Sequence, residues 1–243
     1  MTTLCLDFGN TRLKAAVFLN DVMQEEILLP DHSPGSVSSI LEKYKPAVSI
    51  LSSVINHDPA IEILLGKKTL FHKLSPSTKI NFTVPVGRPD TIGADRLALC
   101  AAAVRFFPGM NNLVIGLGSC ITYNFIDQKH RFLGGGISPG MDMRFRAMHE
   151  YTAMLPLESA TWNFPLIGYD TKTNLQSGVL NGMACEIEGV IGRYLSKYGN
   201  FNAVLTGGNS TYFAGQLKTR IFADHNFLFK GLYALSELNN CPD

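Results

Sequence analysis

Two strand-turn-strand units, about half a chain apart, constrain the fold of this chain more than any other feature. In the first, an apolar run that begins at Leu4 breaks at a polar turn and resumes as a second strand. In the second, residues 113–124 read strand, Gly-Ser turn, strand, so that Gly9 and Gly118 occupy equivalent places. This recurrence predicts a duplicated domain. The expected domains are residues 1–110 and 111–243.

The other elements indicate an α/β protein. Strands come first and then alternate with helices, which is typical of mixed sheets. Further strands are expected over residues 22–29, 48–52, 69–74, 131–137, 203–206 and 221–228. Helices are expected over residues 37–44, 59–65, 98–106, 141–154, 173–195 and 230–238.

Composition excludes several functional classes. The chain has 243 residues, 46% of them hydrophobic and 17% charged, with a net charge of +1. A near-neutral chain lacks the basic surface that nucleic acid or an anionic membrane attracts, so we expect neither as a partner. No apolar run is long enough to span a bilayer. The five Cys are odd in number and never spaced CxxC, which favours reduced thiols and a cytoplasmic protein.

The first turn carries side chains suited to binding phosphate. Gly9 permits a close backbone approach to an anion, and the Asn10 and Thr11 side chains can donate hydrogen bonds to phosphate oxygens. Lys14 supplies a positive charge, and Asp7 can hold a hydrated Mg²⁺. The alternative is an ordinary hairpin turn with no ligand.

A second polar stretch lies where a loop becomes a helix. Gly93, Asp95 and Arg96 follow a Pro-rich loop and precede an Ala-rich helical run. An acidic residue there either caps the helix or faces a polar substrate, and the adjacent Arg suits a substrate pocket. The residues alone leave both interpretations open.

The second half offers further glycine turns. Ser119 and Thr122 accompany Gly118 in the second hairpin, and Gly207-Gly208 ends a strand, where α/β proteins bind nucleotides. Residues 134–140 are rich in glycine, which suits backbone close to a ligand. Two phosphate-binding turns that face one cleft would suit an ATP-using phosphotransferase, whereas the plain alternative is two ordinary hairpins.

Four motifs, in this order and spacing, resemble type III pantothenate kinase, a family also called Bvg accessory factor. They are Asp7-x-Gly9-Asn10-Thr11-x-x-Lys14, Gly93-x-Asp95-Arg96, Gly134-Gly135-x-Ile137-x-Pro139-Gly140 and Thr206-Gly207-Gly208. The resemblance implies two ribonuclease-H-like domains of the acetate and sugar kinase/Hsp70/actin superfamily, each with a mixed sheet flanked by helices. It also implies a homodimer that uses ATP and Mg²⁺, with K⁺ or NH₄⁺, to phosphorylate pantothenate in the first step of coenzyme A synthesis.

The resemblance assigns roles by position. Asp95 matches the general base, Gly93 and Arg96 match pantothenate contacts, and Thr171 resembles the Thr that reaches the neighbouring subunit's pocket. Asp7, Asn10, Thr11 and Lys14 match the phosphate turn, and the Asp7 carboxylate is also expected to hold Mg²⁺ through water. The residues expected to bind ATP or its phosphates are Asp7, Gly9, Asn10, Thr11, Lys14, Gly118, Ser119, Thr122, Gly207 and Gly208.

Three positions depart from the family pattern. Gly116 and Asn124 replace carboxylates of the second phosphate turn, and Val86 replaces a Tyr that would contact pantothenate. Because the first of these carboxylates belongs to the monovalent-cation site in the family, we expect an active kinase with altered cation dependence. The alternatives are a related kinase with another small hydroxylated substrate, or a weakly active or non-catalytic regulatory protein.

Overall fold

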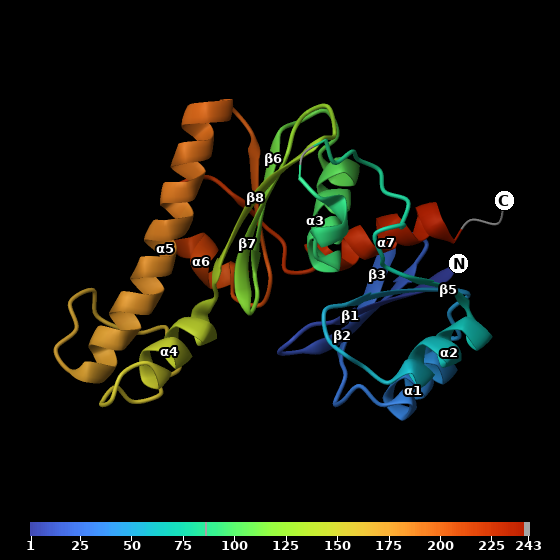
Figure 1. Ribbon diagram of the computed structural model, residues 1–243, viewed down its shortest axis with the longest axis horizontal. Helices are drawn as coiled ribbons and strands as arrows, with labels where there is room; N and C mark the ends of the chain where they lie inside the picture. The colour runs from blue at the N-terminus through green and yellow to red at the C-terminus, as the bar shows by residue number, and fades with distance from the viewer. Residues whose placement is uncertain (86, 241–243) are drawn as a thin grey trace. The chain divides into compact units, whose positions relative to one another are not determined.

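The chain forms two compact units in a computed structural model that describes residues 1–85 and 87–240 (Figure 1). The departure at Val86 therefore lies outside the described residues. Unit 1 comprises Met1–Gly109, Ile126–Gly134 and the chain from Asn226 onward. Unit 2 comprises Met110–Phe125 and Gly135–His225. Both units are thus built from more than one stretch of the chain, and the C-terminal helix packs within unit 1 rather than with the residues that precede it. The expected boundary between residues 110 and 111 stays a prediction.

The first sheet has five strands in the order β3-β2-β1-β4-β5. β1 pairs antiparallel with β2, and β2 with β3, whereas β4 runs parallel to β1 and to β5. The strands are β1 (Thr2–Phe8), β2 (Leu13–Leu19), β3 (Val22–Leu28), β4 (Val48–Ser53) and β5 (Leu70–Lys73). All five match the strands expected from sequence to within two residues at each end.

The second sheet repeats this order. Its strands run β10-β9-β6-β7-β8. If these strands are counted from β6 in chain order, the sheet reads third, second, first, fourth, fifth from the β8 edge, as the first sheet does from the β3 edge. β9 is parallel to β6 and to β10. The strands are β6 (Asn112–Leu117), β7 (Cys120–Ile126), β8 (Phe132–Pro139), β9 (Asn202–Thr206) and β10 (Phe222–Ala223). The predicted pair of mixed sheets is confirmed.

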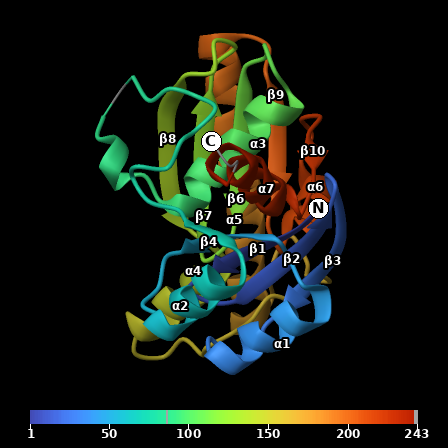
Figure 2. The same cartoon turned by 90° about the vertical axis from the view of Figure 1, so that its right-hand side faces the viewer.

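Helices cover both faces of the first sheet (Figure 2). α1 (Pro34–Tyr44) and α2 (Pro59–Lys68) pack on one face, where they bury the even-numbered side chains of β1. α3 (Ala94–Phe106) and α7 (Phe227–Asn239) pack together and against the other face. Before α3, a short 3-10 helix, η1, spans Pro89–Thr91. Ser33 and Asp58 cap α1 and α2 through side-chain hydrogen bonds, each followed by a Pro that suits the first helical turn.

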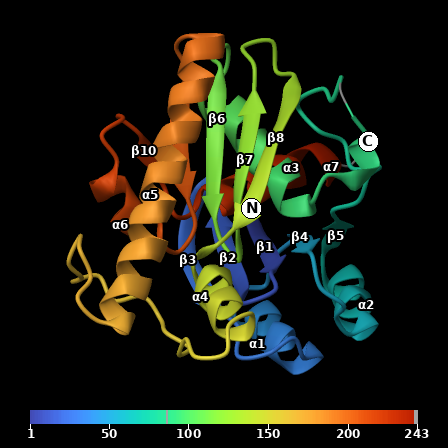
Figure 3. The ribbon, with the colours of Figure 1, turned by 60° about the vertical axis from the view of Figure 1, so that its left-hand side comes forward.

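In the second half, α5 (Thr171–Tyr198) is the longest helix and lies along one face of the second sheet (Figure 3). A capping box fixes its start, because the Asp170 carboxylate and the Thr173 side chain each bind the other's backbone N–H. The two other helices are α4 (Met141–Glu150) and α6 (Ser210–Gln216). No helix in the described part of the chain combines the length and apolar character needed to cross a membrane.

Three expectations about local structure were wrong. α4 ends at Glu150 instead of residue 154, and residues 151–170 contain no helix or strand. The strand expected over 221–228 has only two residues, Phe222 and Ala223, and its last two expected residues belong to α7. α6 was not expected, since it follows a Gly-Gly turn and is only seven residues long.

The contact between α3 and α7 generates a stability prediction. A Cβ on Gly231 of α7 would lie 1.8 Å from the Ala98 carbonyl oxygen of α3. Gly231→Ala is therefore expected to lower the free energy of unfolding by about 1–3 kcal/mol, because rigid backbone must move. Gly66→Ala on exposed α2, where nothing lies within 4 Å, should instead raise it by up to about 1 kcal/mol. Urea denaturation of both variants tests the contrast, and equal effects would contradict it.

Candidate functional site

Asp7 lies on the face of β1 that is turned away from α1 and α2. Successive strand residues point to opposite faces, and the neighbouring Leu6 and Phe8 belong to the apolar core against those helices. Asp7 is therefore directed to the face covered by α3 and α7. In the sheet its direct neighbours are Lys14 on β2 and Ser52 on β4, so three polar side chains share one row.

Asp95 stands in the first turn of α3, as the sequence predicts. It is not the helix cap, because Gly93 occupies the cap position and no side chain makes a capping hydrogen bond there. A Cβ on Gly93 would lie 2.6 Å from the Asp95 carboxylate oxygen. Glycine at position 93 thus makes room for this carboxylate. The Arg96 guanidinium lies 5.6 Å from the centre of the Phe132 ring, a cation–π distance.

The environment of Asp7 disfavours its charged form. Burial and the nearby Asp95 carboxylate raise the pKa of Asp7 to about 7, although the Ser52 hydroxyl and the Lys14 ammonium act in the opposite direction. Sequence predicted each carboxylate separately, and the structure brings them together within unit 1. Two carboxylates that repel each other at one place form an oxygen-rich site that a cation would stabilise.

The first turn is only partly as expected. The Gly9 N–H donates to the Arg12 carbonyl oxygen at 3.1 Å, so this amide is already used within the turn. Asn10 and Thr11 are exposed, as side chains that meet a ligand must be. The Lys14 ammonium forms an ion pair with Glu26 of β3, which sequence reasoning missed. A phosphate would have to compete with, or share, this lysine.

Glycines in unit 2 bring three loops together at backbone distance. A Cβ on Gly140, at the start of α4, would lie 2.4 Å from the Gly118 carbonyl oxygen. Gly207 has φ +102°, and a Cβ there would lie 2.2 Å from the Leu117 carbonyl oxygen. Gly118, Gly207 and the adjacent Gly208 were predicted as phosphate-binding residues from separate segments, and the fold makes them neighbours.

Asn124 and Gly116 stand where the family pattern has carboxylates, and only Asn124 has a side chain with a structural role. Asn124 is fully buried and donates from Nδ2 to the Val114 carbonyl oxygen and to Thr122 Oγ1, both at 3.2 Å. Gly116 pairs with Thr206 across β6 and β9. The buried Thr206 hydroxyl has no hydrogen-bond partner among the described residues. A carboxylate at either position is thus replaced by neutral groups.

The chain is similar to known proteins over nearly its whole length. A family model described as type III pantothenate kinase matches residues 3–193. A type III pantothenate kinase of Christiangramia forsetii is 39% identical over 239 residues, which cover 97% of this chain and 98% of that protein. The chain belongs to the type III pantothenate kinase family.

Solved structures support the fold independently. A Campylobacter jejuni protein assigned to the Baf family matches with a TM-score of 0.62 at 20% identity, over 97% of this chain and 98% of the other. A ROK family glucokinase from Streptomyces griseus, solved with glucose and AMPPNP, matches with a TM-score of 0.51 at 13% identity, over 98% and 99%. At these identities the likeness concerns the fold alone, which is the expected pair of mixed sheets flanked by helices in this member of the pantothenate kinase family.

Thr171, the predicted contact to a neighbouring subunit, is the first residue of α5 and is exposed. It belongs to unit 2, whereas Gly93, Asp95 and Arg96 belong to unit 1. The described chain therefore does not gather these four residues within one unit. The role of Thr171 stays a prediction.

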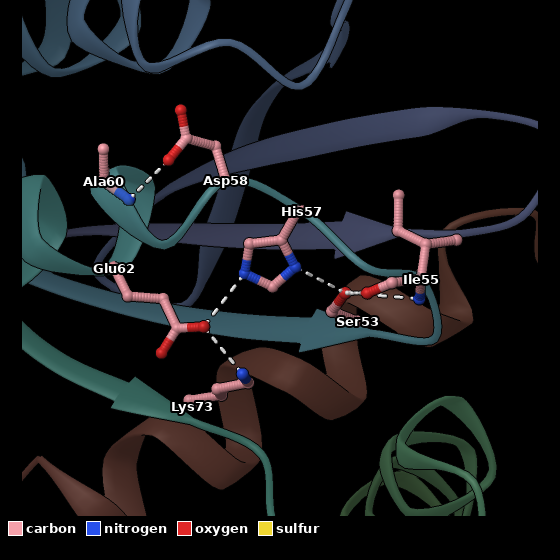
Figure 4. Close-up of polar contacts among 7 residues, drawn as sticks. All are labelled: Ser53, Ile55, His57, Asp58, Ala60, Glu62 and Lys73. Carbon is pink, nitrogen blue, oxygen red and sulfur yellow. Dashed lines mark hydrogen bonds and ion pairs between the residues drawn. The ribbon is translucent and has the colours of Figure 1, made fainter.

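Sequence reasoning missed a polar cluster around His57, between the end of β4 and α2 (Figure 4). The His57 ring is buried and edge-on to Phe8, with ring centres 5.4 Å apart. Its Nδ1 lies 3.0 Å from Ser53 Oγ, and its Nε2 lies 3.0 Å from the Glu62 carboxylate, which also accepts from Lys73 at 2.6 Å. This chain of contacts ties the loop after β4 to α2 and β5. The only available signal was the spacing of His57 and Glu62 around a predicted helix start.

The raised pKa of Asp7 predicts a pH-dependent gain in stability for Asp7→Asn. The folded protein retains the Asp7 proton up to about pH 7, whereas the unfolded chain releases it near pH 4. Ionisation therefore opposes folding as pH rises through this window. The metal-free variant should gain on the order of 1–3 kcal/mol more at about pH 8 than at about pH 5, relative to wild type.

Urea denaturation in EDTA at the two pH values measures this gain. Asp142→Asn, which alters an exposed carboxylate at the start of α4, is the control and should show no such difference. An equal effect of Asp7→Asn at both pH values would contradict the environment described for Asp7.

Proposed function

We propose that the chain transfers the γ-phosphoryl group of ATP to the hydroxyl of pantothenate, with ADP as the other product. Family membership supports the reaction. The observation that supports the site is the pair formed by Asp7 and Asp95, held at the ends of β1 and α3 on one side of the first sheet. Folding gains nothing from two carboxylates that repel each other, so a ligand is the better explanation of the pair.

Asp95 is the general base in this mechanism. It accepts the hydroxyl proton of pantothenate while the oxygen forms its bond to the γ-phosphorus and the bond to the β-phosphate oxygen breaks. Gly93 keeps the space beside the Asp95 carboxylate open, and Arg96 offers a guanidinium for the carboxylate of pantothenate. Such a reaction depends on alignment and charge neutralisation more than on covalent catalysis.

Mg²⁺ fits the Asp7 side of this pair. No group of three or more His, Cys, Asp or Glu side chains that could hold a metal occurs in residues 1–85 and 87–240. Mg²⁺ needs no such group, because it typically takes one or two carboxylates and completes its shell with water and phosphate oxygens. When bound, it would neutralise charge on the transferred phosphoryl group. Asp7 would hold it, directly or through water, in its ionised form.

Each unit offers a glycine turn of its own that would bind phosphate. Asn10, Thr11 and Lys14 supply donors from the first turn, with Lys14 shared with Glu26. Ser119 and Thr122 supply hydroxyls from the second, and the Gly207-Gly208 turn supplies backbone beside it.

A homodimer is part of the proposal, in the cytoplasm as the sequence indicates. The segment between α4 and α5 exposes several large apolar side chains, among them Tyr151 at 85%, Met154 at 89% and Ile167 at 82%. Several large apolar side chains exposed in one segment suit an interface. The ordered segment is held by hydrogen bonds to α5, such as that of Ser177 Oγ to the Leu166 carbonyl oxygen. A second subunit bound to this segment would lie close to Thr171, at the start of α5.

A monovalent-cation site does not fit the residues present. Gly116 offers no oxygen ligand from a side chain, and the neighbouring Thr206 contributes one neutral hydroxyl. K⁺ is bound where several carbonyl oxygens or acidic side chains converge. We therefore assign no step to a monovalent cation.

Substitution of the proposed base tests the function. Asp95→Asn is expected to lower kcat by about 100-fold or more, because it removes the proton acceptor while leaving the side-chain shape intact. The assay follows ADP release and phosphorylated pantothenate from the purified protein. Arg88→Gln, an exposed change in the preceding loop, is the control. Full activity of Asp95→Asn would exclude this mechanism, and an inactive wild type that still binds ATP would favour the regulatory alternative.

The missing carboxylate at Gly116 predicts turnover that does not depend on K⁺ or NH₄⁺. Replacing KCl with tetramethylammonium chloride at equal ionic strength should change kcat by less than about twofold. The reason is that position 116 has no carboxylate to attract K⁺ more strongly than the larger tetramethylammonium ion. Steady-state assays over a range of K⁺ concentrations measure this. Saturable activation by K⁺ would contradict the prediction and place the cation elsewhere.

A further inference from the structure

An ion-pair network in unit 2 connects α4, α5, β7 and β8. Arg144 of α4 donates to the Glu186 carboxylate of α5, and its Nη2 also lies 3.1 Å from Ser138 Oγ. Glu186 accepts a second hydrogen bond, from the Tyr123 hydroxyl at 2.9 Å. The Arg144 and Glu186 side chains retain only 22% and 25% of their exposure. One carboxylate therefore holds a helix and a strand to α5.

The same arginine fixes the backbone where β8 becomes α4. Its Nε donates to the Pro139 carbonyl oxygen at 2.9 Å, one residue before Gly140. The Gly140 N–H donates to the Ser119 carbonyl oxygen at 3.0 Å, and Gly140 leaves no room for a Cβ against the turn. Arg144 is thus two contacts away from the Gly118-Ser119 turn: its side chain holds Pro139, and the next residue holds Ser119.

The charges in this network support each other. Although burial raises the pKa of Glu186, the hydrogen bonds from Arg144, Tyr123 and Ser138 lower it more, so the carboxylate stays ionised. An ionised, partly buried carboxylate that accepts from an arginine is a rigid arrangement, because a guanidinium presents its donors in fixed directions. Such rigidity suits a group that must hold a loop in one position.

We propose that Arg144 and Glu186 are positioning residues for the second phosphate turn, and that they set the affinity for ATP without touching it. This rests on the proposed function of the Gly118-Ser119 turn. The network holds the β8–α4 junction, the junction holds Ser119 through backbone contact, and the turn presents its hydroxyl to phosphate. Loosening the network should therefore weaken ATP binding and leave pantothenate binding intact.

The experiment compares Arg144→Gln and Glu186→Gln with Arg146→Gln. Arg146 is two residues further along the same helix and is exposed, so its substitution matches the change in charge and helix but spares the network. We expect both network variants to raise KM for ATP by about 10-fold or more, with KM for pantothenate changed less than about twofold. Arg146→Gln should resemble wild type in both constants.

Direct binding of a fluorescent ATP analogue separates this proposal from the proposed function. If wild type binds the analogue but does not phosphorylate pantothenate, the function fails while the network is still tested by the change in Kd. Weaker binding in both network variants supports the proposal. Binding equal to that of Arg146→Gln overturns it, as does an equal loss of affinity for ATP and pantothenate, which a general loosening of the fold would cause.

Tyr123→Phe guards against a folding defect, because it deletes one hydroxyl and keeps the ring. It should raise the Kd for the analogue by a smaller factor, about 2- to 5-fold, with an unchanged melting temperature. The double variant Arg144→Gln/Glu186→Gln should bind about as weakly as either single variant, since both act through one network. Additive losses would show that the two residues act independently and would overturn the proposal.

Discussion

The alternation of side chains along β1 is the constraint from which the candidate site in unit 1 follows. Leu4, Leu6 and Phe8 must face α1 and α2 to bury their apolar surface, so Asp7 must face the opposite side. α3 covers that side and begins close enough for Asp95 to raise the pKa of Asp7. A shift of β1 by one residue would exchange the two faces, placing the carboxylate in the apolar core. Core packing and the position of the carboxylate are therefore specified together.

The second sheet repeats the strand order of the first but fixes its turn by different means. In unit 1 a row of charged and polar side chains surrounds the end of β1. In unit 2 the end of β6 is surrounded by backbone, because Gly140 and Gly207 approach the carbonyl oxygens of Gly118 and Leu117 where no side chain fits. The two units thus share a strand order, whereas the chemistry of their turns differs.

Sequence predicted the elements and motifs whose signals are local. Strand alternation, Pro and Gly punctuation and the Asp58-Pro59 start of α2 each lie within a few residues, and the structure agrees. What could not be predicted depends on contacts between distant segments: the ion pair of Arg144 with Glu186 spans 42 residues. No pattern near either residue marks the pair, because only the packing of α4 on α5 brings them together. The short α6 was missed for a related reason, since seven residues give too weak a periodic signal.

The distribution of charge between the turns explains how the loss of two carboxylates can be compatible with a kinase. Asn124 occupies a fully buried site and satisfies the Val114 carbonyl oxygen and Thr122, a role that a carboxylate could not fill because it has no hydrogen to donate. The amide thus stabilises the strand that carries Thr122. At Gly116 the absence of a charge removes the need for a compensating cation. The carboxylates proposed to act in phosphoryl transfer, Asp7 and Asp95, are both in unit 1. Unit 2 can therefore present neutral groups alone to phosphate, although the charged pair of Arg144 and Glu186 holds the junction behind its turn.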